Sequence, residues 1–491
     1  MTIPRGAIGR GSLWNLAGLG LPLAVAVVSV PLIVGTLGVE RFGVLALTWA
    51  IIGAASMLDF GIGRALTQVV ASRRAAGEAQ DLSVVVLTAV ALLGALGVVS
   101  AAAVAVLAPW LSHDVFKVAP ALQAEAERCI VILGVTLPFV LCAGAMQGVL
   151  EGHFRFDLSN LVRMPLALLN YLAPLAMLPW TTDLAWIVGS MALTRCLGFA
   201  TYSLLAWNLI RSPGAVIRFR LDTVVPVLRV AGWMSVSTLV ATAIVYLDRF
   251  AIATLDSMSE LAFYATPFEV VSKLSLLASA VGAALLPIFS SLADKSPRQV
   301  QGIVGRGLRY VVLLVFPATM VVVVFAEQAL ALWLNDRFAH ASTRVAQILA
   351  AGIFVNSLAI VPLILLYGAG RAATVARLHV IELPLYALLL WHLVGRFGAV
   401  GAAFAWTVRA AVDSALLFVI ARGFYVTNDL HFWRAGLAMA AGLAALGFGI
   451  AIPGLHARLA YGAACLAAFA LYAWLGLLSK EERVALLKWR P

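Results

Sequence analysis

The sequence predicts an all-α polytopic membrane protein. Of its 491 residues, 63% are hydrophobic and 12% are charged, whereas soluble domains are about half apolar and a quarter charged. Apolar runs of about 20 residues, long enough to cross a hydrocarbon core as a helix, recur from end to end. None of the segments between these runs has the length or composition of a soluble domain.

Hydropathy and loop chemistry predict about 14 membrane helices. Arg5 and Arg10 precede the first apolar run, which lacks the short core and A-x-A site of a cleaved signal peptide, so we expect it to be retained. The first half of the chain holds the predicted helices 13–35, 40–63, 83–109, 128–150, 157–179 and 183–210. The second half holds 227–254, 260–290, 303–334, 343–368, 373–394 and 398–421, followed by 434–452 and 457–478.

An internal repeat relates the two halves of the chain. With an offset of about 219 residues, segment 35–37 aligns with segment 253–255. Further along, PWLSHD at 109–114 resembles LWLNDR at 332–337. Repeats of this kind are typical of transporters, in which two similar bundles form one molecule.

The repeat predicts three parts. Two pseudo-symmetric lobes of about six helices occupy 1–212 and 213–425, and two extra helices with a tail occupy 426–491. Because six is an even number, both lobes enter the membrane in the same direction, and their pseudo-axis should follow the membrane normal. Two such bundles favour a carrier that works by alternating access over a channel, and a membrane scaffold is the alternative.

Lys and Arg are distributed unevenly between the two sets of connecting loops. One set, which includes Arg73, Arg74, Arg218, Arg220 and the C-terminal tail, holds most of them, and the alternate set mixes fewer with Glu and Asp. Because basic loops stay on the cytoplasmic side, we expect both termini to be cytoplasmic. The dispersal in short loops also argues against nucleic acid binding, despite a net charge of +11.

The sequence contains no motif for catalysis, ATP hydrolysis or dinucleotide binding. Its four cysteines lie in or beside apolar runs, without the spacing of a disulfide framework or a zinc site: Cys129, Cys142, Cys196 and Cys465. We therefore expect neither an enzyme nor a cofactor or metal, and the energy for transport must come from a gradient, the membrane potential or disposal of the substrate.

Charged side chains inside helices concentrate in the second half of the chain. Glu269 and Lys273 are four residues apart, and so are Arg409 and Asp413, so each pair can share one helix face. Charges in hydrocarbon are costly and normally face a protein interior or a watery cavity. Two interpretations stay open: the pairs neutralise each other and fix helix register, or they line a substrate cleft.

Arg195 lies in the middle of a predicted helix with no acid one turn away. An arriving phosphate is the partner that best explains it, although Glu382 or Asp413 from another helix could also satisfy the charge. Arg409 is its counterpart in the second half, so each lobe is expected to supply a cationic group to a central cleft.

Four further charged residues are candidates. Asp248 and Arg249 lie towards the outer end of a helix, where Arg249 could snorkel. Arg64 is a candidate for contact with lipid headgroups, and Asp59 is a candidate proton or sodium coupling site. Several aromatic residues could stack on sugars, although membrane belts and core packing explain them equally well: Trp233, Tyr246, Tyr264 and Phe268.

Several segments together resemble the Wzx-type polysaccharide flippases of the multidrug/oligosaccharidyl-lipid/polysaccharide exporter superfamily. YLDRFAIATLDSMSELAFYATPFEVVSKL at 246–274 is similar to their helix 7 and 8 signature, and VGTLGVERFGVLAL at 34–47 is similar to its first-lobe version. RFGAVGAAFAWTVR at 396–409 and ALWLNDRFAHASTRVAQIL at 331–349 resemble other segments of the family. The resemblance covers nearly the whole chain.

The resemblance implies a flippase of the bacterial inner membrane that moves an undecaprenyl-diphosphate-linked oligosaccharide for O-antigen or exopolysaccharide synthesis. It implies a central cavity in which the basic residues neutralise the diphosphate and the acids meet the sugar: Arg195, Arg249, Lys273 and Arg409, with Glu269, Glu382, Asp413 and Asp248. A polysaccharide polymerase and glycosyltransferases are the implied protein partners. The alternatives are a flippase for a peptidoglycan precursor (lipid II), a cation-coupled multidrug antiporter, which should rely on acids rather than arginines, and a scaffold of a glycan assembly complex.

Overall fold

The computed structural model describes residues 5–57, 62–75, 82–210, 239–292, 297–425, 430–478 and 483. These residues are helical apart from short connections, and they contain no strand. Eight helical stretches among them are long and apolar enough to cross a membrane. The prediction of an all-α membrane protein is thus confirmed, while the total of 14 crossings and the cytoplasmic position of the termini stay predictions.

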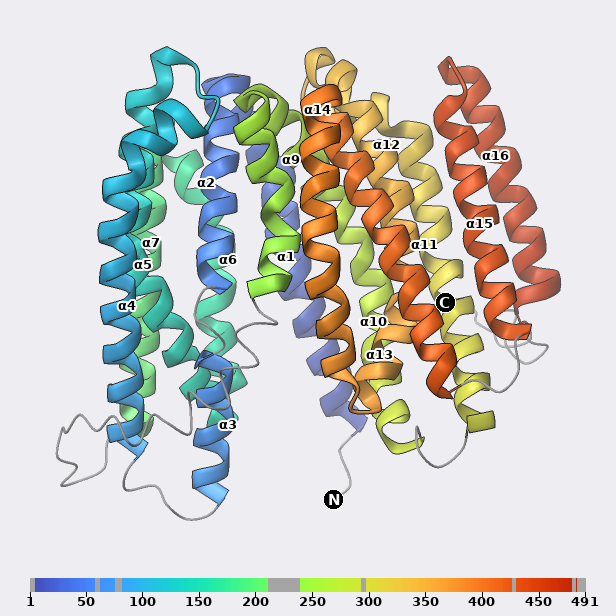
Figure 1. The fold of residues 1–491 in the computed structure, drawn as a ribbon, viewed down its shortest axis with the longest axis horizontal. Helices are drawn as coiled ribbons and strands as arrows, with labels where there is room; N and C mark the ends of the chain where they lie inside the picture. The colour runs from blue at the N-terminus through green and yellow to red at the C-terminus, as the bar shows by residue number, and fades with distance from the viewer. Residues whose placement is uncertain are drawn as a thin grey trace. The chain divides into compact units, whose positions relative to one another are not determined.

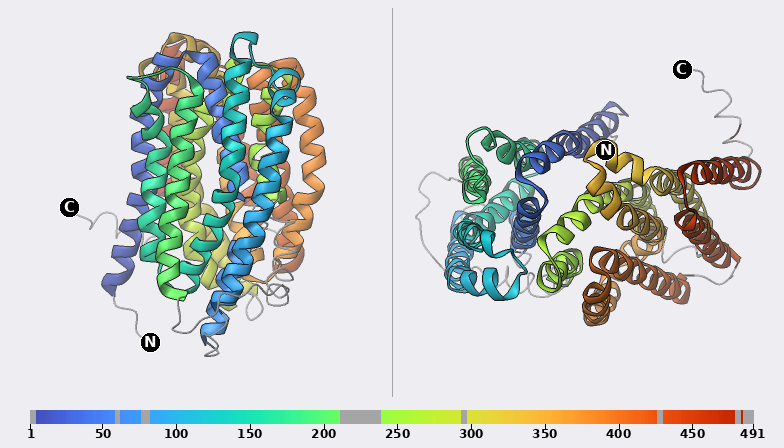
Figure 2. Two further views of the ribbon diagram at one scale, coloured as in Figure 1. Left: turned by 90° about the vertical axis from the view of Figure 1, so that its left-hand side faces the viewer. Right: turned by 90° about the horizontal axis from the view of Figure 1, so that it is seen from above.

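The chain forms two compact units, Met1–Ala262 and Phe263–Pro491. The first contains a helix over 239–255 and seven others: α1 (Arg5–Leu37), α2 (Val39–Met57), α3 (Ile62–Ala75), α4 (Leu82–Trp110), α5 (Gln123–Gly152), α6 (Phe156–Met177) and α7 (Leu184–Ile210). Among these, α5 is central because it packs against α3, α4 and α7 (Figure 1, Figure 2). Its buried face includes Ala145, Val149 and Leu150.

The second unit begins within α9 (Met258–Val271), which a short 3₁₀ turn joins to α10 (Ser275–Leu292). The remaining helices are α11 (Pro297–Trp333), α12 (Asp336–Leu358), α13 (Ile360–Gly368), α14 (Ala372–Tyr425), α15 (Leu430–Ala451) and α16 (Leu455–Tyr472). The central helix is α12, which packs against α11, α14 and α15. Each unit is therefore built around one central helix, and the predicted pair of repeated lobes, with boundaries at 212 and 425, stays a prediction.

Two predicted helices are joined in α14. A straight helix of its 54 residues would run about 80 Å, far beyond a bilayer core of about 30 Å. Gly398 interrupts it with φ 54° and ψ −133°, a conformation that only glycine adopts readily. The backbone of Gly401 then approaches the carbonyl of Leu393, so α14 folds back as a helical hairpin between the predicted spans 373–394 and 398–421.

The last two helices, α15 and α16, pack against α11 within the second unit. Figure 1 shows α15 and α16 side by side, and both contact α11. Polar contacts reinforce this packing, because Arg458 forms an ion pair with Glu327 at 3.3 Å and Arg309 donates to the carbonyl of Leu477 at 3.0 Å. The helices α15 and α16 thus lie in one compact unit with α11, and the predicted boundaries of a separate part at 426–491 stay a prediction.

Candidate functional site

The α14 hairpin brings four ionisable side chains together, here named the α14 cluster: His379, Glu382, Arg409 and Asp413. Arg409 Nη1 lies 3.9 Å from Glu382 Oε2, and His379 Nε2 lies 3.5 Å from Asp413 Oδ1. Both pairs join the first arm of the hairpin to the second. Sequence spacing predicts that Arg409 and Asp413 share a face of one helix, and the structure places a polar side chain of the opposite arm beside each of them, Glu382 and His379 respectively.

The α14 cluster is buried and incompletely hydrogen-bonded. Glu382 and Asp413 expose 4% and 5% of their surface. Both carboxylate oxygens of Glu382 and the Nε of Arg409 find no hydrogen-bonding partner among the described residues. The guanidinium of Arg409 lies over the rings of Tyr386 and Trp406 at 5.8 and 5.9 Å. Because unsatisfied buried polar groups are costly, this arrangement favours the arrival of a ligand.

The donor atoms of His379, Glu382 and Asp413 lie within 4.8 Å of one another. One metal ion could bridge atoms at that spacing. The positive charge of Arg409, 3.9 Å from Glu382, opposes a divalent ion there. His379 was not singled out in the sequence, although its place one helical turn before Glu382 in an apolar segment could have indicated it.

Glu269 and Lys273 form the predicted pair at i and i+4. Their charged atoms are 3.4 Å apart, and the side chains are 46% and 40% exposed. Lys273 lies in the 3₁₀ turn between α9 and α10. One residue before Glu269, Phe268 packs edge-on against Trp406 at 5.7 Å, so the pair is held next to the second arm of α14.

In the first unit, Arg195 projects from α7 and donates a hydrogen bond to Asn170 Oδ1 of α6 at 2.9 Å. Both side chains are half-buried. Arg195 therefore has a neutral amide partner rather than an acid. Asn170 was missed in the sequence, yet an amide in the middle of the apolar stretch 157–179 is the signal that could have found it.

Asp248 and Arg249 are buried in the first unit rather than snorkelling, with 0% and 5% of their surface exposed. Arg249 Nη1 lies 3.2 Å from Asp248 Oδ1 and also donates to the carbonyl of Val245 at 2.9 Å. Its guanidinium stacks on Tyr246 at 5.5 Å. The pair is neutralised on its own helix in this conformation, and its role in the cavity stays a prediction.

The two remaining candidates are Arg64 and Asp59. Arg64 is exposed on α3, which is compatible with the predicted contact with lipid headgroups. Asp59 lies outside the described residues, so its predicted coupling role stays a prediction.

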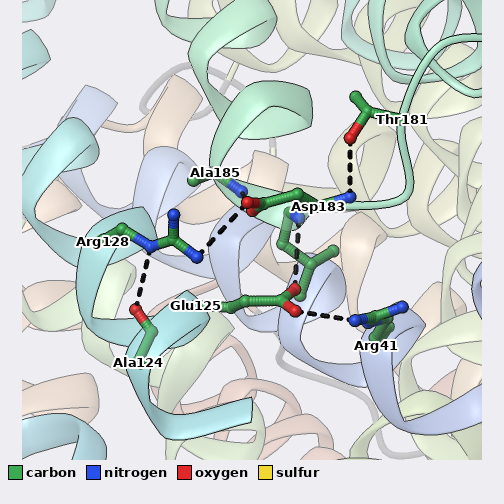
Figure 3. A network of polar contacts seen from close by, with 8 residues as sticks. Arg41, Ala124, Glu125, Arg128, Thr181, Asp183 and Ala185 are labelled. Atoms are coloured by element: carbon green, nitrogen blue, oxygen red, sulfur yellow. Dashed lines mark hydrogen bonds and ion pairs between the residues drawn. The ribbon is translucent and has the colours of Figure 1, made fainter.

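A separate polar network joins three helices of the first unit (Figure 3). Arg41 of α2 forms an ion pair with Glu125 of α5 at 2.7 Å, and Glu125 also accepts from the N–H of Leu184. Arg128 pairs with Asp183 at 3.3 Å. These charges satisfy one another and fix α2, α5 and α7, so the network is structural.

Comparison with known proteins finds relatives in sequence and similar structures in fold. A putative O-antigen transporter of Shigella flexneri is 24% identical over 408 residues, which are 83% of this chain and 96% of that protein. The lipid II flippase MurJ in an inward closed conformation has a TM-score of 0.70 at 11% identity, over 94% of this chain and 99% of that one. An inward-facing multidrug resistance MATE family transporter of the MOP superfamily has a TM-score of 0.65 at 14% identity, over 84% and 94%.

At such low identities the two solved structures are evidence for the fold alone. The family described as "Polysaccharide biosynthesis protein" matches residues 36–343, which is more than half of the chain. The chain therefore belongs to the polysaccharide biosynthesis protein family, as its resemblance to Wzx-type flippases predicted.

Proposed function

We propose that this protein is a flippase that moves an undecaprenyl-diphosphate-linked oligosaccharide from the inner to the outer leaflet of the bacterial inner membrane. Family membership and the relative named as a putative O-antigen transporter support this proposal. The observation that carries it is the presence of Arg195 and Arg409 within apolar helices, each held by a side chain that an anionic ligand could replace.

Arg409 is the clearer case of a replaceable contact. Its separation of 3.9 Å from Glu382 is longer than a charge-assisted hydrogen bond, which measures about 2.7–2.9 Å. A phosphate oxygen at that shorter distance would interact more strongly with the guanidinium. Glu382 thus acts as an internal competitor that holds Arg409 until the diphosphate arrives.

The remaining parts of the proposal concern the path of the substrate. The two lobes rock in alternating access while the polyprenyl tail stays in lipid. The exposed Glu269–Lys273 pair meets the sugar headgroup. The product passes to a polysaccharide polymerase, and glycosyltransferases supply the substrate.

The first test is a lipid extraction from the host with and without the gene. Mass spectrometry identifies the polyprenyl-linked glycan that accumulates, and a membrane-impermeant label reports its leaflet. Accumulation of one complete repeat unit on the cytoplasmic side is the expected result. Accumulation of the peptidoglycan precursor would favour the lipid II flippase instead. Unchanged glycolipids with reduced resistance to cationic drugs would favour the antiporter, and unchanged levels of both would favour a scaffold.

A double substitution tests the arginines themselves. We expect Arg195→Ala, Arg409→Ala to abolish rescue of the deletion strain, while Arg155→Ala, which removes an exposed arginine paired with Asp157, keeps it. Transport at the wild-type rate by a double variant that inserts normally would contradict the assignment.

A further inference from the structure

Side chains from four helices of the first unit form a second group around Arg195, here named the N-unit cluster: Trp49, Asn170, Tyr171, Arg195 and Tyr246. The ring of Trp49 on α2 meets that of Tyr171 on α6 at 5.4 Å. The neighbouring Asn170 accepts from Arg195 of α7.

A close backbone contact completes the cluster. The Tyr246 hydroxyl lies directly against Gly53, one helical turn after Trp49, and any β-carbon at Gly53 would collide with it. Residues four apart share a helix face. Trp49 and Tyr246 are therefore held on the same side of α2, and α2, α6, α7 and helix 239–255 surround the cluster.

The polar atoms of the cluster are not all satisfied by the protein. The indole Nε1 of Trp49 is buried and finds no acceptor among the described residues, although buried indole N–H groups usually have one. The Asn170 side chain makes one described hydrogen bond, through its oxygen, which leaves two amide donors. Three N–H donors, one from Trp49 on α2 and two from Asn170 on α6, thus lie in the cluster with half-buried aromatic rings.

We propose that the N-unit cluster binds the sugar residue next to the diphosphate of a polyprenyl-linked glycan. This inference rests on the proposed function. The exposed parts of the Trp49 and Tyr171 rings pack against the apolar face of the sugar. The Trp49 N–H and the Asn170 amide donate to its hydroxyl oxygens, and Arg195, which has five N–H donors, takes the adjacent phosphate.

This arrangement separates recognition of the sugar from recognition of the phosphate. Trp49→Phe keeps an aromatic ring and removes only the N–H donor, and Asn170→Ala removes the amide. Each loss of a hydrogen bond to a sugar hydroxyl should weaken glycolipid binding by about tenfold. Trp49→Phe leaves both Arg195 and its partner Asn170 in place, so its affinity for the bare diphosphate lipid should stay within about threefold. Asn170→Ala also removes the partner of Arg195, so for this variant the readout is the ratio of the two Kd values, in which a change at the shared phosphate cancels.

The test uses the full chain in lipid nanodiscs and two probes: undecaprenyl diphosphate, and the undecaprenyl-diphosphate glycan extracted from the host. Competition binding gives the ratio of their Kd values for wild type, Trp49→Phe and Asn170→Ala. The matched controls are Trp186→Phe and Asn160→Ala. Trp186 is a residue of α7 that is 66% exposed, and Asn160 is an amide on α6 outside the cluster. Size-exclusion profiles verify that each variant is folded.

The expected result is a glycan preference that falls about tenfold in the two cluster variants and is unchanged in the two controls. An unchanged preference in both cluster variants would overturn the sugar subsite while leaving the flippase proposal intact. Failure of the wild-type protein to bind either probe would overturn the proposed function itself, and the subsite with it.

Discussion

Replacing Glu382 with Gln should strengthen binding of a diphosphate to this protein. The substitution keeps the shape of the side chain and removes the negative charge 3.9 Å from Arg409. Arg409 and Asp413 then remain as opposite charges on the second arm of α14. Because the carboxylate no longer competes for the guanidinium, a phosphate can engage it without displacing an anion.

The magnitude follows from the geometry. Two unit charges 3.9 Å apart attract by about 4 kcal/mol at an effective dielectric constant of about 20. Desolvation of the two groups, whose side chains are only 10% and 5% exposed, offsets most of this attraction. We expect about a third of it, roughly 1.4 kcal/mol, to appear as a tenfold lower Kd for the diphosphate.

The assay is a titration of the nanodisc-embedded protein with undecaprenyl diphosphate. The control is Glu269→Gln, because the pair between Glu269 and Lys273 at 3.4 Å is 46% and 40% exposed. Exposed ion pairs contribute less than about 1 kcal/mol, so this variant should change the Kd by only about twofold. A Glu382→Gln variant that binds no tighter than the control would refute the idea that Glu382 competes for Arg409.

Two other predictions concern stability, and both are measured by thermal unfolding of the purified protein. Arg41→Ala should lower the free energy of unfolding by about 1.5 kcal/mol because it leaves Glu125, only 14% exposed, without its ionic partner. Arg128→Ala, which removes a more exposed pair, should lower it by about 0.5 kcal/mol. Equal losses would contradict the idea that burial makes the first pair stronger. Gly398→Ala should lower the free energy of unfolding by about 1–3 kcal/mol, because alanine is strained at the φ of 54° found there. Gly395→Ala lies in open space within the same helix, so it should be neutral or stabilising by up to about 1 kcal/mol.

Hydropathy predicted the break in α14 but not every helix of the described residues: α3 (Ile62–Ala75) lies almost entirely beyond the predicted end at 63. The predicted ends at 394 and 398 bracket Gly398, where the backbone leaves the helical conformation. By contrast, the single predicted helix 260–290 is interrupted by the 3₁₀ turn at Ser272–Leu274. Apolar length determines where a chain can cross a membrane, but a local change in helix type leaves hydropathy almost unaltered.

The partners of the charged residues were harder to predict. Spacing along one helix correctly predicted the contact between Glu269 and Lys273. It could not predict that Arg409 meets Glu382, because that contact depends on how the α14 hairpin closes. Asn170 was missed for a related reason: an uncharged amide attracts little notice in an apolar helix until a neighbouring helix brings Arg195 to it.

The different partners of Arg195 and Arg409 predict that the two arginines contribute unequally to binding. A diphosphate that engages Arg195 displaces a neutral amide at 2.9 Å, whereas one that engages Arg409 must displace a carboxylate. The second exchange recovers less free energy, because an existing charge interaction is lost. In the same titration, Arg195→Ala should therefore raise the Kd for undecaprenyl diphosphate more than Arg409→Ala does. The rise in Kd caused by Arg195→Ala should be nearly the same with and without Glu382→Gln, since Arg195 and Glu382 act through different contacts. Equal increases in Kd for the two arginine variants would show that Asn170 and Glu382 do not determine how strongly each arginine binds phosphate.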